Sequence, residues 1–159
     1  KFFSLKNNIR QKLYRSREPI FVETFDRLLS FKVEIFRLLN QDHHNLLLFE
    51  IQYSKVVDRF SELDIFINKN TLHYPVDILE NIKSIMRTFN SMMLSYRREL
   101  IRNDGNTESS FEMIDSYKKA IEPLYDELQE TLRYLLESND RAKPIGRNFF
   151  VRMKKLRFW

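Results

Sequence analysis

Residues 75–102 carry the most regular pattern of apolar positions in the chain. Their apolar side chains fall in three interleaved series that each step by seven positions: Ile78, Ile85, Met92; Leu79, Met86, Met93, Leu100; and Ile82, Phe89, Tyr96. Three apolar positions in every seven are typical of a helix packed inside a bundle. Pro75 suits the first turn of such a helix, and Gly105 suits the left-handed residue that ends it. This helix would be roughly 40 Å long, so it needs partner helices of similar length.

Three further stretches repeat the same seven-residue step and supply those partners. The first runs from Pro19 to Leu39, the second from Leu46 to Ile67 and the third from residue 109 to residue 138. Their series are Phe21, Leu28, Ile35 with Val22, Leu29, Phe36; Leu46, Tyr53, Phe60, Ile67 with Phe49, Val56, Leu63; and Ile114, Ile121, Leu128, Leu135 with Phe111, Tyr125, Leu132. The pattern predicts an all-α protein, an antiparallel four-helix bundle of long heptad-patterned helices.

The connection between the first two of these helices allows two interpretations. Residues 40–45 are wholly polar, which favours a turn, yet they contain neither glycine nor proline. The heptad phase also carries through the connection, because Phe49 lies fourteen residues after Ile35. The sequence therefore permits either two helices joined by a turn or one continuous helix from residue 19 to about residue 69.

The other boundaries have clearer signals. Residues 68–74 precede Pro75 and form a predicted break, because the residue before a proline is disfavoured in the helical conformation. Ser109 and Glu112 have the spacing of a capping box, so we expect a helix to start there. Pro123 lies inside that helix and should kink it. Residues 138–140 should end it.

The composition supports an all-α fold. The 159 residues include only two glycines and four prolines, fewer than the turns of an all-β or α/β fold require. With 43% hydrophobic residues and no apolar run long enough to span a membrane, the chain is expected to be soluble and globular. It has no cysteine, which excludes disulfides and zinc–thiolate sites and is compatible with a reducing compartment. The chain begins at Lys1 and shows no signal peptide, so we expect a piece of a longer protein.

Charge divides the sequence into three parts. Residues 1–18 contain six Lys or Arg against one acid, a net charge of +5. Residues 139–159 contain seven against one acid, a net charge of +6. The total of +5 then leaves −6 for residues 19–138. We therefore expect a basic amphipathic N-terminal segment, an acidic helical bundle and a basic aromatic C-terminal tail.

Both ends have the pattern of short basic amphipathic helices. Apolar positions recur at steps of three and four in Phe2, Leu5, Ile9 and Leu13, and again in Ile145, Phe149, Met153 and Leu156. Such segments bind anionic membrane surfaces or flank a transmembrane helix. The residues expected to contact a membrane or another anion are Lys6, Arg10, Lys12, Arg15, Arg17, Arg147, Arg152, Lys154, Lys155, Arg157 and Trp159. The alternative is that both ends dock on the bundle and leave their charges in water.

Motifs of catalysis and metal binding are largely missing. The sequence contains no Gly-rich phosphate loop, HExxH motif, serine elbow or EF-hand loop. A di-iron bundle needs a glutamate three residues before each of two histidines, and the residues there are Asn40, Gln41 and Asn70. We therefore expect neither a metal nor a cofactor. Arg97, Arg98 and Arg102 could form an anion patch, although cations at this position more often complement the helix dipole.

One short stretch suggests an enzyme. The segment from Arg37 to His43 resembles the Arg-x(4–6)-His motif of HEPN ribonucleases, which are also helical bundles. The resemblance implies that Arg37 and His43 lie together at a dimer cleft and act on RNA. It covers seven residues, and Leu38 stands where the family usually has a polar residue. The alternative is a polar connector with an arginine on the helix surface.

The sequence favours a non-enzymatic role. We expect the cytoplasmic domain of a membrane-anchored or membrane-associated protein, at the inner face of a membrane. Its partners would be another protein or a second copy of itself. The competing hypothesis is a nucleic-acid-binding protein whose basic ends neutralise phosphates, although the acidic bundle would repel a polyanion. A HEPN-like ribonuclease is the third hypothesis.

Overall fold

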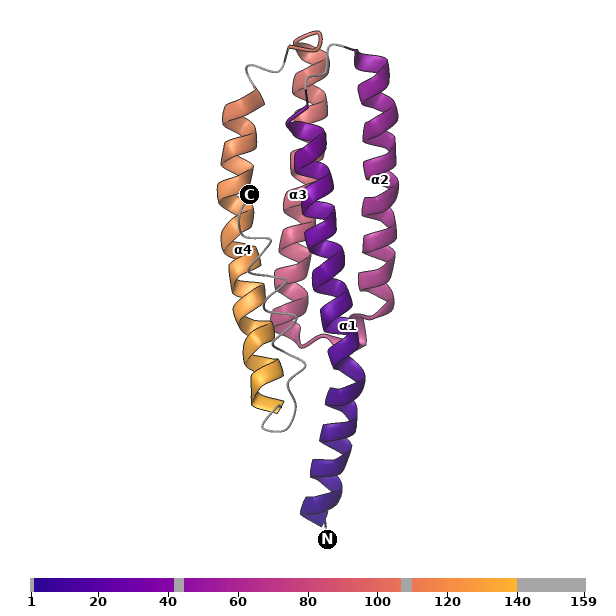
Figure 1. The fold of residues 1–159 in the computed structure, drawn as a ribbon, viewed down its shortest axis with the longest axis vertical. Helices are drawn as coiled ribbons and strands as arrows, with labels where there is room; N and C mark the ends of the chain where they lie inside the picture. Colours follow the sequence, from indigo (N-terminus) through magenta and orange to yellow (C-terminus); the bar gives the residue numbers. More distant parts are fainter. Residues whose placement is uncertain (1, 42–44, 107–109, 140–159) are drawn as a thin grey trace.

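The computed structural model describes residues 2–41, 45–106 and 110–139, with side chains described for residues 17–41, 45–106 and 111–135. These residues form four α-helices and no strand, which confirms the all-α prediction. The helices are α1 (Phe2–Leu39), α2 (Leu46–Lys69), α3 (Val76–Arg102) and α4 (Ser110–Asn139), with a short 3-10 helix at Thr71–His73 between α2 and α3. Helices that follow each other in sequence run antiparallel, so the fold is an up-down-up-down bundle (Figure 1).

Helices α1 and α2 are separate elements, which settles the choice that the sequence left open. α1 ends at Leu39, and α2 begins at Leu46. Asn45 caps α2, because its side-chain oxygen accepts a hydrogen bond of 3.1 Å from the backbone N–H of Leu48. The heptad phase shared by the two helices therefore does not reflect a continuous helix.

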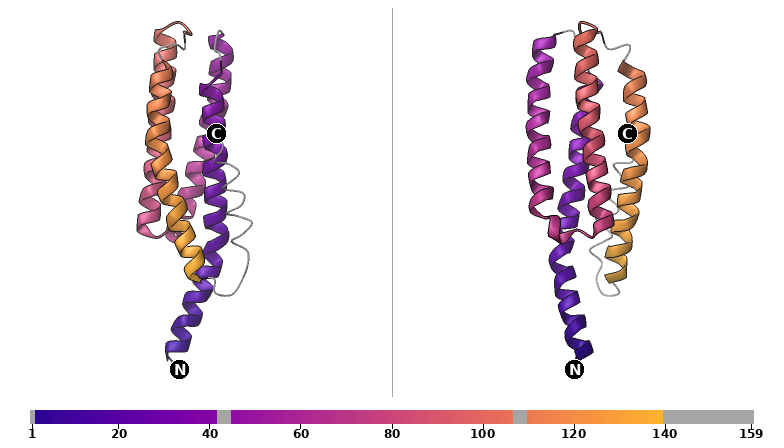
Figure 2. Two further views of the ribbon diagram at one scale, coloured as in Figure 1. Left: turned by 60° about the vertical axis from the view of Figure 1, so that its left-hand side comes forward. Right: turned by 180° about the vertical axis from the view of Figure 1, so that it is seen from behind.

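Helix α1 differs from the prediction at its other end. The sequence suggested one short helix over residues 1–18 and another starting at Pro19, but α1 runs without a break from Phe2 to Leu39. A proline inside a helix removes one backbone hydrogen bond and crowds the preceding turn, but its φ angle is helical, so a long helix can contain it. The first residues of α1 extend past the ends of the other three helices (Figures 1 and 2).

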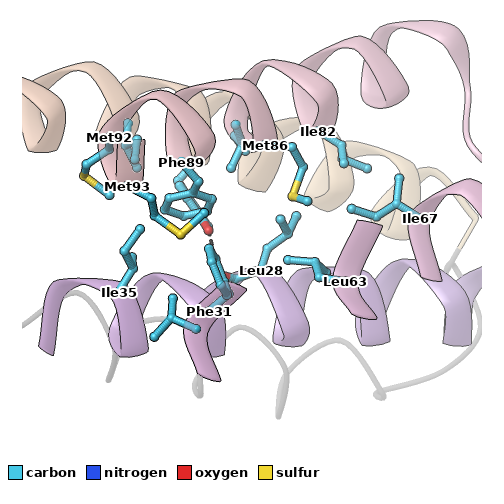
Figure 3. Close-up of a cluster of buried hydrophobic side chains, with 14 of the residues drawn as sticks. Leu28, Phe31, Ile35, Leu63, Ile67, Ile82, Met86, Phe89, Met92 and Met93 are labelled. Atoms are coloured by element: carbon cyan, nitrogen blue, oxygen red, sulfur yellow. Dashed lines mark hydrogen bonds between the residues drawn. The ribbon is translucent and has the colours of Figure 1, made fainter. Parts of the chain in front are cut away.

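Helix α3 contributes the largest buried face to the core, as its pattern predicts. Nine of the ten residues in its three apolar series are buried, and Leu79 is half-buried. Leu28, Phe31 and Ile35 of α1 and Leu63 and Ile67 of α2 face the buried stripe of α3 (Figure 3). In α4, Ile114, Ile121, Tyr125, Leu128 and Leu132 are buried. The core is therefore assembled around one helix that presents a wide apolar face.

Two apolar assignments need correction or refinement. Phe111 is 57% exposed, so it does not belong to the core. It lies in the first turn of α4, which is close to the edge of the bundle. Leu29 and Phe36 of α1 are half-buried and pack against the core, and Val22 is also half-buried, so the second series of this helix borders the buried stripe.

The ends of α3 and α4 follow the expected chemistry with small shifts. Pro75 is the N-cap of α3, one residue before the first turn. At the other end Gly105 has a φ of 85° and Asp104 a φ of 50°. The N–H of Gly105 donates to the Leu100 carbonyl over 2.9 Å, and the N–H of Asp104 donates to Ile101, which is a Schellman motif. α4 continues through Pro123 and starts at Ser110, and Ser109 of the expected capping box lies outside the described residues.

We predict that a charge placed in the buried stripe strongly destabilises the bundle. Ile82→Asp and Leu128→Asp should each lower the free energy of unfolding by at least about 3 kcal/mol, because each buries an unpaired carboxylate. Chemical denaturation followed by circular dichroism measures this. Ser91→Asp, at an exposed position of α3, is the matched control and should change stability by less than about 0.5 kcal/mol. Equal effects at Ile82 and Ser91 would show that the stripe is not the core.

Candidate functional site

The predicted N-terminal contact residues belong to the free beginning of α1. Lys6, Arg10, Lys12 and Arg15 lie in the first half of α1, and their side chains are outside the described set. Arg17 is half-buried, and its Nε is buried without a hydrogen-bond partner among the described residues. Arg17 therefore lies at the edge of the bundle, where the extension begins.

The other predicted contacts are not placed. Arg147, Arg152, Lys154, Lys155, Arg157 and Trp159 lie outside the described residues. His43 also lies outside them, so the structure does not show whether it meets Arg37. Arg37 itself is exposed in the last turn of α1, where a cation complements the negative end of the helix dipole. The ribonuclease hypothesis is therefore supported only by the sequence motif from Arg37 to His43.

Arg97 and Arg102, near the end of α3, lie beside different glutamates. Arg97 donates from Nε to both carboxylate oxygens of Glu50, over 3.0 and 3.2 Å, and its guanidinium lies 5.6 Å from the ring of Tyr53. The hydrogen bond that Arg97 donates to Glu50 raises the pKa of Arg97. Arg102 is 4.0 Å from Glu99, and its side chain is mostly exposed. Arg97 therefore ties α3 to α2, whereas Arg102 lies near a glutamate of its own helix.

A groove between α1 and α2 was not apparent from the sequence. It has a volume of about 300 Å³, and we call it the α1–α2 groove. Its lining residues are Glu23, Asp26, Arg27, Ser30, Phe31 and Glu34 of α1 and Arg59, Glu62 and Leu63 of α2. A spacing of 25 residues separates Glu34 from its partner Arg59, so only the register of the two helices brings these groups together. The groove therefore arises from the way α1 and α2 pack together, and the sequence pattern of either helix alone does not reveal it.

The seam between α1 and α4 contains a half-buried lysine. Lys32 places its ammonium 4.9 Å from the ring centre of Tyr125, whose hydroxyl donates over 2.6 Å to the Leu28 carbonyl. Burial raises the pKa of Tyr125 well above its usual value. Burial also lowers the pKa of Lys32, while the carboxylates of Glu122 and Asp126 act in the opposite direction. The seam thus combines a cation–π contact with a buried hydrogen bond.

Among the described residues, no group of three or more histidine, cysteine, aspartate or glutamate side chains is arranged to hold a metal ion. His73, on the 3-10 helix, is the one histidine whose side chain the structure describes. None of the helical segments that were described combines the length and apolar character required to cross a bilayer.

Comparison with known proteins adds no further assignment. No protein-family model matches the chain, and neither a curated protein nor a solved structure shows significant similarity to it. Any functional interpretation therefore depends on the physical features of this chain alone.

We predict that Lys32 costs stability at neutral pH. Its folded pKa is lower than its ordinary value of 10.5, so the charged form is less stable in the folded protein than in the unfolded chain. The cost is full below the folded pKa and disappears as pH rises toward 10.5. Lys32→Met keeps the apolar stem and should raise Tm by about 1–3 °C at pH 7, with a smaller gain at pH 10.

The matched control is Lys119→Met. Lys119 lies on the exposed side of α4, 2.7 Å from Asp115, whose hydrogen bond raises the pKa of Lys119. This variant should not raise Tm at pH 7. A lower Tm for Lys32→Met at pH 7 would show that the contact with Tyr125 outweighs the cost of burial.

Proposed function

We propose that the chain is a non-enzymatic helical-bundle module that acts through protein contacts at an anionic membrane surface. The observation that carries the proposal is the extension of α1, whose first residues reach past the ends of the other helices (Figure 2). Residues 1–18 carry a net charge of +5 and an apolar series with helical spacing. A basic amphipathic helix that extends from an acidic bundle can lie in an anionic interface while the bundle stays in water.

Four exposed apolar residues at one end of the bundle support the role of protein contacts. Leu47 and Ile51, in the first turns of α2, are 72% and 49% exposed, and Leu94 and Ile101 of α3 are each 50% exposed. The ion pair between Glu50 and Arg97 joins these two helix segments, so the four side chains lie at the same end of the bundle. Groups of exposed apolar residues commonly mark partner surfaces. This end is opposite to the extension of α1, so a partner and a membrane could be bound together.

Vesicle binding tests the proposal. The full chain should bind vesicles of anionic lipid and not vesicles of neutral lipid, in a sedimentation assay at physiological salt. The test variant changes Phe2, Leu5, Ile9, Phe149, Met153 and Trp159 to Ser and keeps every Lys and Arg. Its affinity should fall at least about tenfold, because burial of apolar side chains supplies much of the attraction at an interface.

The control variant combines Leu47→Ser with Ile101→Ser at the opposite end of the bundle. It also removes exposed apolar area, and it should bind vesicles like the parent chain. Salt dependence alone does not discriminate, because vesicles and oligonucleotides both bind more weakly as salt rises. Tight binding of an oligonucleotide without vesicle binding, unaffected by the six apolar changes, would favour the nucleic-acid hypothesis and overturn the proposal.

A further inference from the structure

The α1–α2 groove has an acidic rim and a small apolar floor. Phe31 and Leu63 are each only 4% exposed and form the floor. Four carboxylates and two guanidinium groups surround it. The arrangement of these six charges decides which ligand the groove can accept.

Both arginines of the groove are already paired. Arg27 donates from Nε and Nη2 to Glu23, over 3.0 and 2.7 Å, and its guanidinium lies 4.1 Å from the ring centre of Phe66. Arg59 binds Glu34 across the two helices. Neither Asp26 nor Glu62 forms an ion pair within the described part of the chain. The groove therefore retains two uncompensated negative charges.

The same chain contains a segment with complementary charge. Residues 141–159 hold seven Lys or Arg and no acid, and their apolar residues have helical spacing. The segment follows directly after α4, which ends at Asn139. Residues 140–159 can span up to roughly 65 Å when extended, more than the roughly 36 Å length of α2. This length, counted from the end of α4, permits the later residues of the segment to reach the groove.

We propose that residues 141–159 dock in the α1–α2 groove of their own chain, with their cations at Asp26 and Glu62 and an aromatic residue over the apolar floor. Tethering favours this occupant, because a linked segment has an effective concentration in the millimolar range, whereas a segment from another molecule does not. Docking also withholds these cations from an anionic surface. In that respect the inference rests on the proposed function, since groove and membrane then compete for one segment.

Disulfide cross-linking tests the docking, because the chain contains no cysteine of its own. Asn148→Cys places a thiol in the segment without removing a charge or an apolar side chain. Ser30→Cys places the second thiol in the groove, and Ser91→Cys places it on the exposed side of α3 instead. The ring centres of Phe31 and Phe89 lie 5.0 Å apart in an edge-to-face contact, so the two serines near them lie at a similar level along the bundle and are matched positions.

The expected result is a faster intramolecular disulfide for the Ser30 pair. It should form at least about tenfold faster than the Ser91 pair at low salt, and high salt should reduce the difference. Adding Asp26→Asn with Glu62→Gln should bring the Ser30 rate close to the Ser91 rate. The control Asp58→Asn with Glu80→Gln removes two exposed charges outside the groove and should leave the rates unchanged.

Three outcomes would overturn the proposal. Equal rates for the Ser30 and Ser91 pairs would show that the segment does not prefer the groove. An unchanged rate after Asp26→Asn with Glu62→Gln would show that these two charges do not hold the segment. A disulfide that joins two molecules would assign the groove to a second copy. Cross-linking needs no lipid, so its outcome is independent of the vesicle assay.

If docking withholds the cations of the segment from a membrane, the Asp26→Asn, Glu62→Gln variant should also bind anionic vesicles several-fold more tightly than the parent chain.

Discussion

Burial of one helix holds this protein together. Helix α3 presents an apolar face so wide that three other helices are needed to cover it. Its ends are set by Pro75 and by the left-handed residues after Asn103, so its length is fixed by local chemistry. The lengths of α2 and α4 follow from it, because a shorter partner would leave part of the stripe in water. The width and length of the apolar face of α3 therefore set the number and length of the helices that pack with it.

Polar contacts fix how the covering helices are placed. The Tyr125 hydroxyl holds α4 against the α1 backbone, and Thr24 accepts a hydrogen bond of 2.6 Å from Tyr74 between α1 and the segment before α3. Thr24 in turn donates to the Ile20 carbonyl. In these buried contacts the hydroxyl groups of Tyr125, Thr24 and Tyr74 each have a hydrogen-bond partner. The ion pairs, in contrast, are partly exposed, and each contributes at most about 1 kcal/mol to stability. Asn81 is an exception, because its buried Oδ1 has no hydrogen-bond partner among the described residues.

The sequence predicted the helices and most of the core, because the seven-residue step reports directly which side of a helix is buried. It misjudged Pro19, where a rule about helix starts failed inside a longer helix, and Phe111, whose position in the first turn of α4 leaves it exposed. The sequence did not decide between a turn and a continuous helix at residues 40–45, because the heptad phase of Ile35 and Phe49 matched by coincidence. The α1–α2 groove was beyond prediction, since it needs the register that places Arg59 beside Glu34. Lys32 was missed for the same reason.

Hydrogen exchange of the full chain tests the central claim most directly. If burial of α3 organises the bundle, the backbone amides from Ile82 to Tyr96 should exchange only through global unfolding and be the slowest in the chain. Amides at the beginning of α1, which extends beyond the other helices from its first residue Phe2, should exchange at least about a hundredfold faster. Equal protection of these two segments, or faster exchange in α3 than in α2 and α4, would contradict the account.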